Sequence, residues 1–254
     1  MVQGIYAGDT FLPCKGVAFD KDGTLIDIFS MLSRLGQERY RHISSAVGED
    51  ALQFYRKCTG FDPATGKVDP YGPLASASRR DEVAVAACAL WLAGIPWYKA
   101  IALAREAYDG ADQTLDPTEG VRLLPGVKDA LISLSQSGLR LSVVTSDGHI
   151  RTEKMLSFLG IADLVDLIVA ADDVENPKPS PDAVMLVAKN MNISPSQIVV
   201  VGDTPQDAIM GKEAGAKTVG VLSGVAPRED LERFFDIVIE GVKDIRPAPT
   251  QPVR

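Results

Sequence analysis

Apolar and polar residues alternate along most of the chain in a way that predicts strands and helices in turn. Short apolar runs bounded by polar residues are typical of buried strands, and helical spacing of apolar residues separates them. The predicted strands cover residues 15–19, 141–145, 167–170, 198–202, 217–221 and 237–239, and the predicted helices between them cover 127–137, 150–159, 181–191 and 207–214. Such repeated strand–helix units predict a Rossmann-like, doubly wound parallel sheet.

The pattern changes between the first strand and the second. Here no strand-like run appears, and the apolar spacing is helical. The predicted helices cover 29–47, 49–58, 79–93 and 96–113, with a loop over 60–78 that is rich in proline and glycine. We therefore expect an α/β core made of residues 1–27 and 118–245, an inserted all-helical domain at 28–117, and a disordered, proline-rich tail at 246–254.

Composition narrows the class of protein. The 254 residues are 46% hydrophobic and 24% charged, which is typical of a globular chain with a sizeable core. The formal net charge of −8 argues against a general nucleic-acid or anionic-membrane surface. Three cysteines without CxxC spacing suggest neither a disulfide framework nor a zinc site, and no signal-peptide pattern is present, so a reduced, cytoplasmic location is expected.

Chemistry-bearing residues follow four of the predicted strands. Asp20 and Asp22 stand two positions apart where the first strand ends, and a charged pair there is costly to desolvate unless something compensates it. The other groups are Thr145 and Ser146 after the second strand, Lys178 after the third, and Asp203 and Asp207 after the fourth. Because the carboxyl ends of parallel strands meet at one edge, we expect these groups to converge.

Clustered carboxylates beside a lysine and a hydroxyl suit a particular ligand set. Hard oxygen ligands favour Mg²⁺ together with a substrate phosphate, and the lysine and hydroxyl match the outer oxygens of a phosphoryl group. Each element has an ordinary alternative: Lys178 in a surface loop, Thr145 as a β-branched strand end, and residues 203–205 as a turn. Chance does not easily place all of them at strand ends in one chain.

The same segments resemble the four motifs of the haloacid dehalogenase-like superfamily. They are FDKDGTL at residues 19–25, the strand that ends in Thr145, KPSPD at 178–182, and GDTPQD at 202–207 with Gly211, Ala214 and Gly215 beyond it. The resemblance covers about residues 15–240, and the insertion stands where this superfamily has a helical cap. Its phosphoglycolate phosphatase group is the most similar.

The resemblance implies a role for each residue. Asp20 would attack phosphorus to give an aspartyl-phosphate, and Asp22 would protonate the leaving oxygen and later take a proton from water. Thr145 and Lys178 would hold the phosphoryl oxygens, with donors from Gly23 and Ser146. Mg²⁺ would be held by Asp20, by Asp22 through its main-chain carbonyl and by Asp203, with the metal-site residue Asp207 behind these ligands or bonded to metal-bound water.

The resemblance also narrows the reaction. Asp22 disfavours the dehalogenases, which lack this carboxylate, and the phosphonoacetaldehyde-cleaving members, which carry alanine there. We expect a Mg²⁺-dependent phosphomonoester hydrolase acting on a small phosphorylated metabolite, with phosphoglycolate as leading candidate. A pyrophosphatase, a sugar-phosphate phosphatase and a β-phosphoglucomutase-like phosphomutase share the same residues. A signalling receiver domain or a non-catalytic regulatory module is the non-enzymatic alternative.

Substrate choice is expected to come from the insertion. Arg79 and Arg80 start one of its predicted helices, where cations are electrostatically unfavourable, so they are candidates for contacting a substrate carboxylate or second phosphate. A solvated arginine pair is the ordinary alternative. The expected partners are a small phosphorylated metabolite and no nucleic acid or membrane, in a monomer or homodimer.

Overall fold

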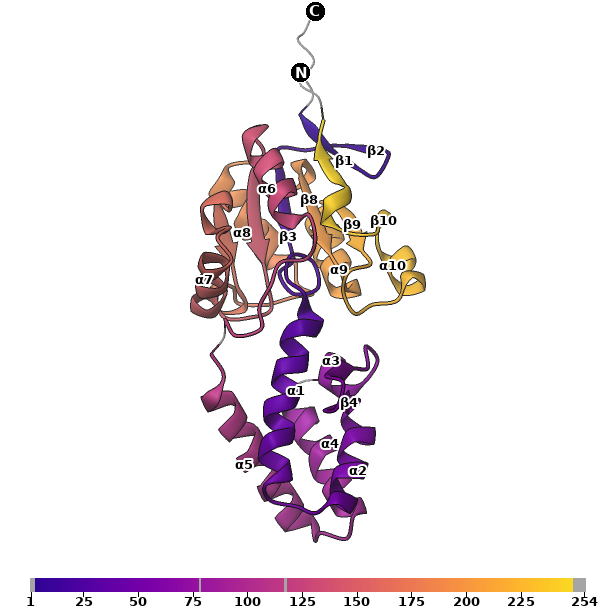
Figure 1. Ribbon diagram of the computed structural model, residues 1–254. Helices are drawn as coiled ribbons and strands as arrows, with labels where there is room; N and C mark the ends of the chain where they lie inside the picture. The colour runs from indigo at the N-terminus through magenta and orange to yellow at the C-terminus, as the bar shows by residue number, and fades with distance from the viewer. Residues whose placement is uncertain (1–2, 78, 117, 249–254) are drawn as a thin grey trace, which may run out of the picture. The chain divides into compact units, whose positions relative to one another are not determined.

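The computed structural model describes residues 3–77, 79–116 and 118–248. The chain forms two compact units, one made of residues 1–27 and 121–254 and the other of residues 28–120 (Figure 1). No helix in the described ranges is long and apolar enough to cross a membrane.

The first unit is built on a six-stranded sheet whose neighbouring strands are all parallel. Its order is β10 (Ile237–Ile239), β9 (Lys217–Val221), β8 (Ile198–Gly202), β3 (Gly16–Phe19), β6 (Arg140–Val144) and β7 (Leu167–Val169). From β3 the chain proceeds to β6 and β7 on one side, and β8 then returns to the other side of β3. A crevice is expected beyond the carboxyl ends of β3 and β8, where the winding direction changes. This sheet confirms the predicted fold class.

Helices connect the strands, the first four of them at the predicted places, whereas the fifth, α10, was not predicted. They are α6 (Val127–Gln136), α7 (His149–Phe158), α8 (Asp182–Met191), α9 (Pro205–Ala214) and α10 (Arg228–Phe234). Val184 and Val187 of α8 pack with Met210 of α9 against Ala18 and Val200, which are buried on one face of the sheet. β3 and β8 are buried along their whole length, so the central strands hold their carboxyl ends in fixed positions.

A small antiparallel sheet was not predicted. β1 (Gly4–Ala7) forms a hairpin with β2 (Thr10–Pro13), and β11 (Ile245–Pro247) pairs with the other side of β1. The prediction of disorder from residue 246 onward is therefore wrong for Arg246 and Pro247, since both pair with β1. The last predicted tail residues, 249–254, lie outside the described residues.

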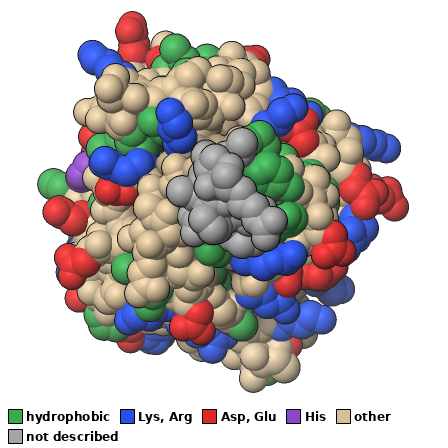
Figure 2. All heavy atoms as spheres, turned by 90° about the horizontal axis from the view of Figure 1, so that it is seen from above, with side chains coloured by type: hydrophobic (Ala, Val, Ile, Leu, Met, Phe, Trp, Pro, Cys, Tyr) green, Lys and Arg blue, Asp and Glu red, His purple; other side chains and the backbone are tan. Residues whose placement is uncertain are grey.

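Figure 2 shows that basic and acidic side chains are interspersed over the face viewed from above.

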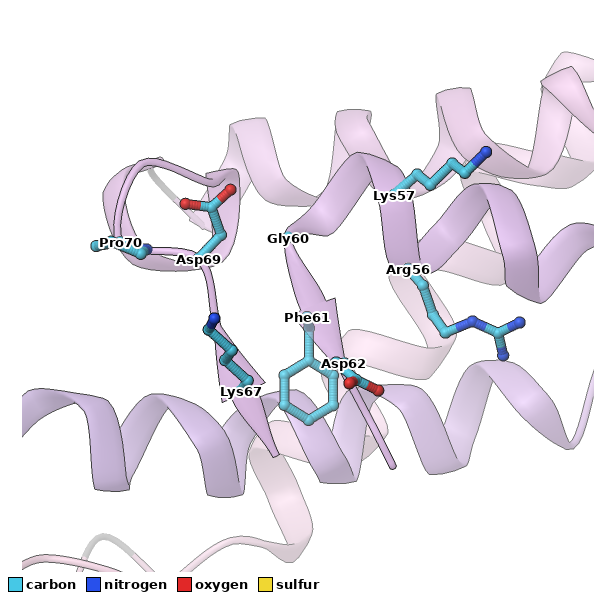
Figure 3. Close-up of a pocket in the computed structure, with 8 residues that line it drawn as sticks. All are labelled: Arg56, Lys57, Gly60, Phe61, Asp62, Lys67, Asp69 and Pro70. Atoms are coloured by element: carbon cyan, nitrogen blue, oxygen red, sulfur yellow. The ribbon is translucent and has the colours of Figure 1, made fainter. Parts of the chain in front are cut away.

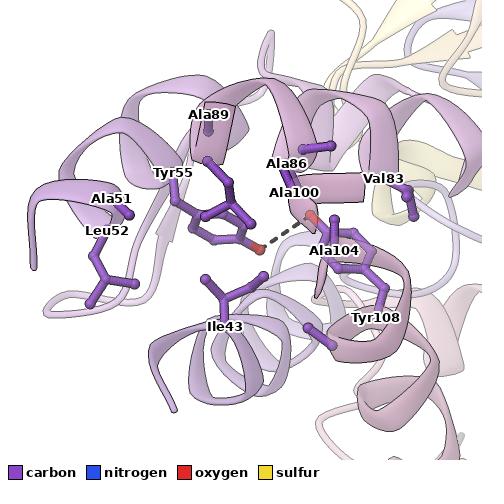
Figure 4. Close-up of a cluster of buried hydrophobic side chains, with 13 residues drawn as sticks. Ile43, Ala51, Leu52, Tyr55, Val83, Ala86, Ala89, Ala100, Ala104 and Tyr108 are labelled. Atoms are coloured by element: carbon purple, nitrogen blue, oxygen red, sulfur yellow. Dashed lines mark hydrogen bonds between the residues drawn. The ribbon is translucent and has the colours of Figure 1, made fainter. Parts of the chain in front are cut away.

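The second unit is mainly helical, but it is not all-helical as expected, because it also contains a two-stranded sheet. Its helices are α1 (Ile28–Ser44), α2 (Glu49–Thr59), α3 (Pro73–Ser76), α4 (Arg79–Leu92) and α5 (Trp97–Thr114). Its core is rich in alanine, which lets α4 and α5 approach closely, and the hydroxyl groups of Tyr55 and Tyr108 meet within it at 3.2 Å (Figure 4). The predicted loop at 60–78 contains, besides α3, a hairpin of β4 (Phe61–Asp62) and β5 (Lys67–Val68) that the sequence did not predict.

Candidate active site

Two acidic pairs lie at the carboxyl ends of the central strands. Asp20 directly follows β3, and its N–H donates to the carbonyl of Val201 in β8 at 2.8 Å. Asp203 directly follows β8, and Asp207 lies in the first turn of α9. Asp203 and Asp207 are almost fully buried, and the side chain of Asp20 is 12% exposed. The sequence thus placed these carboxylates at the correct edge of the sheet.

Lys178 joins the two pairs. Its ammonium group lies 2.6 Å from Asp20 Oδ1 and 2.6 Å from Asp207 Oδ1, and its side chain is 4% exposed. The other oxygen of Asp207 accepts bonds from the N–H and the hydroxyl of Thr204, which caps α9. Asp207 therefore holds both the helix start and the lysine. The side chain of Lys178 points inward, although the loop that carries it is largely exposed.

Burial is the largest single influence on the pKa values of Asp20, Asp203 and Lys178. Burial raises the pKa of Asp20 to about 7; Lys178 opposes the rise, and Asp207 and Asp22 add to it. Burial and then the charges of Asp20 and Asp207 raise the pKa of Asp203 well above its usual value. Burial lowers the pKa of Lys178, but the two carboxylates outweigh this effect and hold it above the ordinary lysine value. Ionising Asp20 and Asp203 together is therefore unfavourable without a further cation beside them.

The donor set fits a divalent cation. Two ammonium groups, those of Lys178 and Lys21, face five carboxylates, those of Asp20, Asp22, Asp147, Asp203 and Asp207, and a divalent ion would offset most of the remaining negative charge. The described ranges hold no group of three or more His, Cys, Asp or Glu side chains arranged for a metal. Such an ion would thus rely on few carboxylates and on main-chain, water or substrate oxygens, as Mg²⁺ commonly does.

Thr145, Ser146 and Gly23 lie in the adjoining turns. Thr145 is buried just beyond β6, and its hydroxyl accepts a bond from the N–H of Asp147 at 3.1 Å, whereas Ser146 is exposed. Gly23 has a φ of +79°, and its N–H donates to the carbonyl of Ile26, so this amide closes the turn after β3. The Gly23 amide is thus already bonded in this structure.

Three features of this edge were missed in the sequence. Lys21 is fully buried between Asp22 and Asp147. The loop after β9 also reaches the edge: the N–H of Val225 donates to Asp203 Oδ2 at 3.1 Å, and the hydroxyl of Ser223 donates to the carbonyl of Gly23 at 2.8 Å. The sequence could have predicted that this loop reaches the edge, because the loop follows a predicted strand of the same sheet.

Arg79 and Arg80 lie at the start of α4, as expected. The guanidinium of Arg79 contacts Asp112 at 2.8 Å and Asp109 at 3.0 Å, and stacks over the ring of Tyr108 at 4.9 Å. These contacts tie α4 to α5, so Arg79 has a structural role within the helical unit. Arg80 is exposed.

The helical unit has a pocket of its own, of about 610 Å³. It lies between the end of α2 and the β4–β5 hairpin and is lined by Arg56, Lys57, Gly60, Phe61, Asp62, Lys67, Asp69 and Pro70 (Figure 3). Arg56 is engaged by Glu49 at 2.6 Å, and Asp62 accepts bonds from residues of its own turn. The lining therefore contains basic and acidic side chains together with the apolar residues Phe61 and Pro70.

The parallel sheet, the helical insertion and the acidic edge define one class of α/β enzyme. The chain belongs to the haloacid dehalogenase-like hydrolase family, whose model matches residues 14–215. Membership confirms the resemblance that the motifs indicated and identifies the protein as a hydrolase.

Individual relatives agree with this placement. The chain is 29% identical over 240 residues to the phosphoglycolate phosphatase of Escherichia coli (strain K12), covering 94% of this chain and 93% of that protein. A HAD family hydrolase from Deinococcus radiodurans R1, solved with bound phosphate and sodium, has a TM-score of 0.66 at 20% identity and matches 91% of this chain and 92% of its own. A putative β-phosphoglucomutase from Thermotoga maritima has a TM-score of 0.63 at 20% identity, with 91% and 95% covered. These two likenesses show the fold.

Proposed function

We propose that the protein is a cytoplasmic, Mg²⁺-dependent phosphatase that hydrolyses a small-metabolite phosphomonoester, with phosphoglycolate as the leading candidate. The observation that carries this proposal is the buried contact of Lys178 with Asp20, two residues before Asp22, at the edge where the sheet changes direction. The similarity to phosphoglycolate phosphatases over nearly the whole chain supports the choice of substrate.

Two residues would divide the chemistry. A carboxylate oxygen of Asp20 attacks phosphorus, and the bond from phosphorus to the ester oxygen breaks to leave an aspartyl-phosphate. Asp22 donates a proton to the departing oxygen. It then takes a proton from the water that attacks the aspartyl-phosphate, which restores Asp20 and releases inorganic phosphate.

Other residues would bind and orient the phosphoryl group. Lys178 donates to its oxygens and restrains the charge of Asp20, and the hydroxyl of Thr145 and the N–H of Ser146 supply further donors. Asp20, Asp203 and the carbonyl of Asp22 would hold Mg²⁺, with Asp207 bound to it through water. The ion would neutralise charge that develops on the phosphoryl oxygens.

The test is a phosphate-release screen over phosphorylated metabolites and pyrophosphate, with Mg²⁺ and with EDTA. We expect Mg²⁺-dependent release with a preference for phosphoglycolate, and no turnover by the Asp20→Asn variant. Near-wild-type turnover by that variant would show that Asp20 is not the nucleophile.

The same screen separates the neighbouring activities. Preferred hydrolysis of pyrophosphate or of sugar phosphates would identify the corresponding phosphatase. Formation of an isomeric sugar phosphate without phosphate release would identify a phosphomutase. Absence of any turnover would favour a regulatory module, and light scattering of the same sample would distinguish a monomer from a homodimer.

A further inference from the structure

Lys21 is a buried charge at the centre of the acidic edge. Its side chain is 0% exposed, and its ammonium group lies 2.9 Å from Asp22 Oδ2, 2.9 Å from Asp147 Oδ2 and 3.3 Å from the sulfur of Met155. A buried ammonium group is costly unless it is well paired, and here two carboxylates compensate it. The motif at residues 19–25 assigns roles to Asp20 and Asp22 but none to Lys21, which stands between them.

The contact makes the two oxygens of Asp22 unequal. Oδ2 is held by Lys21, whereas Oδ1 is buried and has no hydrogen-bond partner among the described residues. A buried oxygen without a partner is unusual in a native protein and calls for an explanation such as a bound ligand or a catalytic role. Pairing on one side thus fixes the rotation of the carboxylate and leaves the other oxygen available.

Lys21 is itself held from the turn between β6 and α7. Asp147 accepts a bond from the N–H of Gly148 at 2.8 Å, and its carboxylate also contacts Arg151 at 3.3 Å. The N–H of Asp147 donates to Thr145, so the turn after β6 fixes the position of the carboxylate. A chain of contacts therefore runs from Asp147 through Lys21 to Asp22, and Arg151 is an exposed cation outside it.

We infer that Lys21 is a positioning residue for proton transfer: it holds Asp22 Oδ2 so that Oδ1 faces the oxygen of the leaving group. This inference rests on the proposed function. As the bond from phosphorus to the ester oxygen breaks, the proton on Oδ1 passes to that oxygen. Lys21 gains and loses no proton, and Asp147 sets its position.

Leaving groups distinguish this role from a purely structural one. An alkyl phosphate needs a proton on its departing oxygen, whereas 2,4-dinitrophenyl phosphate releases an anion that is stable at neutral pH. The constant kcat/KM reports only steps through loss of the leaving group, so the later attack of water does not enter it. A misplaced Asp22 should therefore slow the alkyl ester selectively.

The experiment compares kcat/KM for both esters in Lys21→Met. We expect a loss of about 100-fold for the preferred alkyl phosphate and less than about 3-fold for the dinitrophenyl ester. In the Asp22→Asn background, Lys21→Met should cause no further selective loss, because the two residues act as a unit. Arg151→Gln, which removes the exposed cation on Asp147, is the matched control and should change neither constant by more than about 2-fold.

Asp147→Asn covers the case in which Lys21→Met does not fold. It removes the negative charge of one partner of Lys21 at a partly exposed position, and we expect a selective loss of about 10-fold for the alkyl ester. Equal losses for both esters, or no loss, in the folded variants would overturn the positioning role.

The proposed function is tested separately in the same assays. It fails if the wild-type protein hydrolyses neither ester, or if Asp20→Asn hydrolyses them at the wild-type rate. If wild type and Asp20→Asn behave as expected and the Lys21 variants show no selectivity for the leaving group, only the inference about Lys21 fails.

Discussion

At the scale of single residues, Asp203 depends on a glycine across from it. A Cβ added at Gly23 would lie 2.4 Å from Asp203 Oδ2, and the φ of Gly23 is +79°. We expect Gly23→Ala to displace this carboxylate, to weaken Mg²⁺ binding and to lower kcat/KM at least 100-fold. Magnesium titration by calorimetry and steady-state kinetics measure both effects.

Gly215→Ala is the matched control for backbone strain. Its φ is +84°, and an added Cβ would meet nothing within 4 Å. The left-handed conformation alone should cost about 1–2 kcal/mol of stability and leave activity intact. If both variants lost activity equally, crowding of Asp203 would not be the cause.

His149 provides a prediction on pH. Its Nδ1 lies 2.6 Å from Asp173 Oδ2, and this hydrogen bond is the main reason why the pKa of His149 lies above 6.5. Because folding raises the pKa of His149, its protonated imidazole stabilises the folded protein fully below about pH 6.5. This stabilisation is lost as the pH rises through the pKa of His149 in the folded state. NMR titration of the imidazole, and unfolding measured across this range, test the prediction.

Asp173→Asn is the corresponding variant. The pKa of His149 should fall toward 6.5, and this part of the pH dependence of stability should disappear. An unchanged imidazole titration in this variant would show that Asp173 is not the cause of the shift.

Much of the acidic edge could be predicted from single residues, because strand ends in a parallel sheet share an edge. Asp20, Lys178, Asp203 and Asp207 lie together for that reason. Lys21 could not be predicted, since its burial depends on Asp147, which is 126 positions away in the sequence. A lysine between two aspartates carries no local signal of where its side chain points.

At the scale of elements, the helical unit depends on a close contact between α1 and the β4–β5 hairpin. A Cβ added at Gly36 of α1 would lie 2.6 Å from the ring of Phe61, which is buried in the same small core. Alanine usually stabilises a helix relative to glycine by up to about 1 kcal/mol. Here overpacking should outweigh that gain, and we expect Gly36→Ala to be destabilising by about 1–3 kcal/mol in denaturant unfolding.

Gly110→Ala in α5 is the comparison. Its Cβ would meet the ring of His42 at 2.8 Å, and this side chain is only partly buried and can turn away. Helix propensity should then dominate, so stability should stay the same or rise. Equal destabilisation by both substitutions would argue against rigid packing at Phe61.

Elements differed in how well their pattern predicted them. Apolar runs such as β8 and β9 were predicted to the residue, because burial on both faces leaves a continuous signal. The β4–β5 hairpin has strands of two residues, and β11 is held by pairing with β1 at the opposite end of the chain. Strands that depend on distant partners leave too little local pattern to be recognised.

At the scale of the whole molecule, the insertion leaves and re-enters the α/β unit at adjacent points. Ile26 forms an antiparallel bridge with Leu123, and the N–H of Asp27 donates to the carbonyl of Arg122 at 2.9 Å. The side chains of Asp27 and Arg122 form an ion pair at 2.8 Å. The α/β unit therefore holds both ends of the insertion together with its own contacts.

This connection allows the division of labour to be tested. We expect a chain in which a short Gly-Ser linker replaces residues 28–120 to fold, because closing a short loop between adjacent ends costs little. It should keep Mg²⁺-dependent hydrolysis of an aryl phosphate, since the residues proposed to act on phosphorus lie in the α/β unit. It should also lose most of the preference among metabolite phosphates. Circular dichroism measures folding, and kcat/KM over the substrate panel measures activity and preference. If the substrate ranking stayed the same as in the intact protein, the α/β unit and not the insertion would select the substrate.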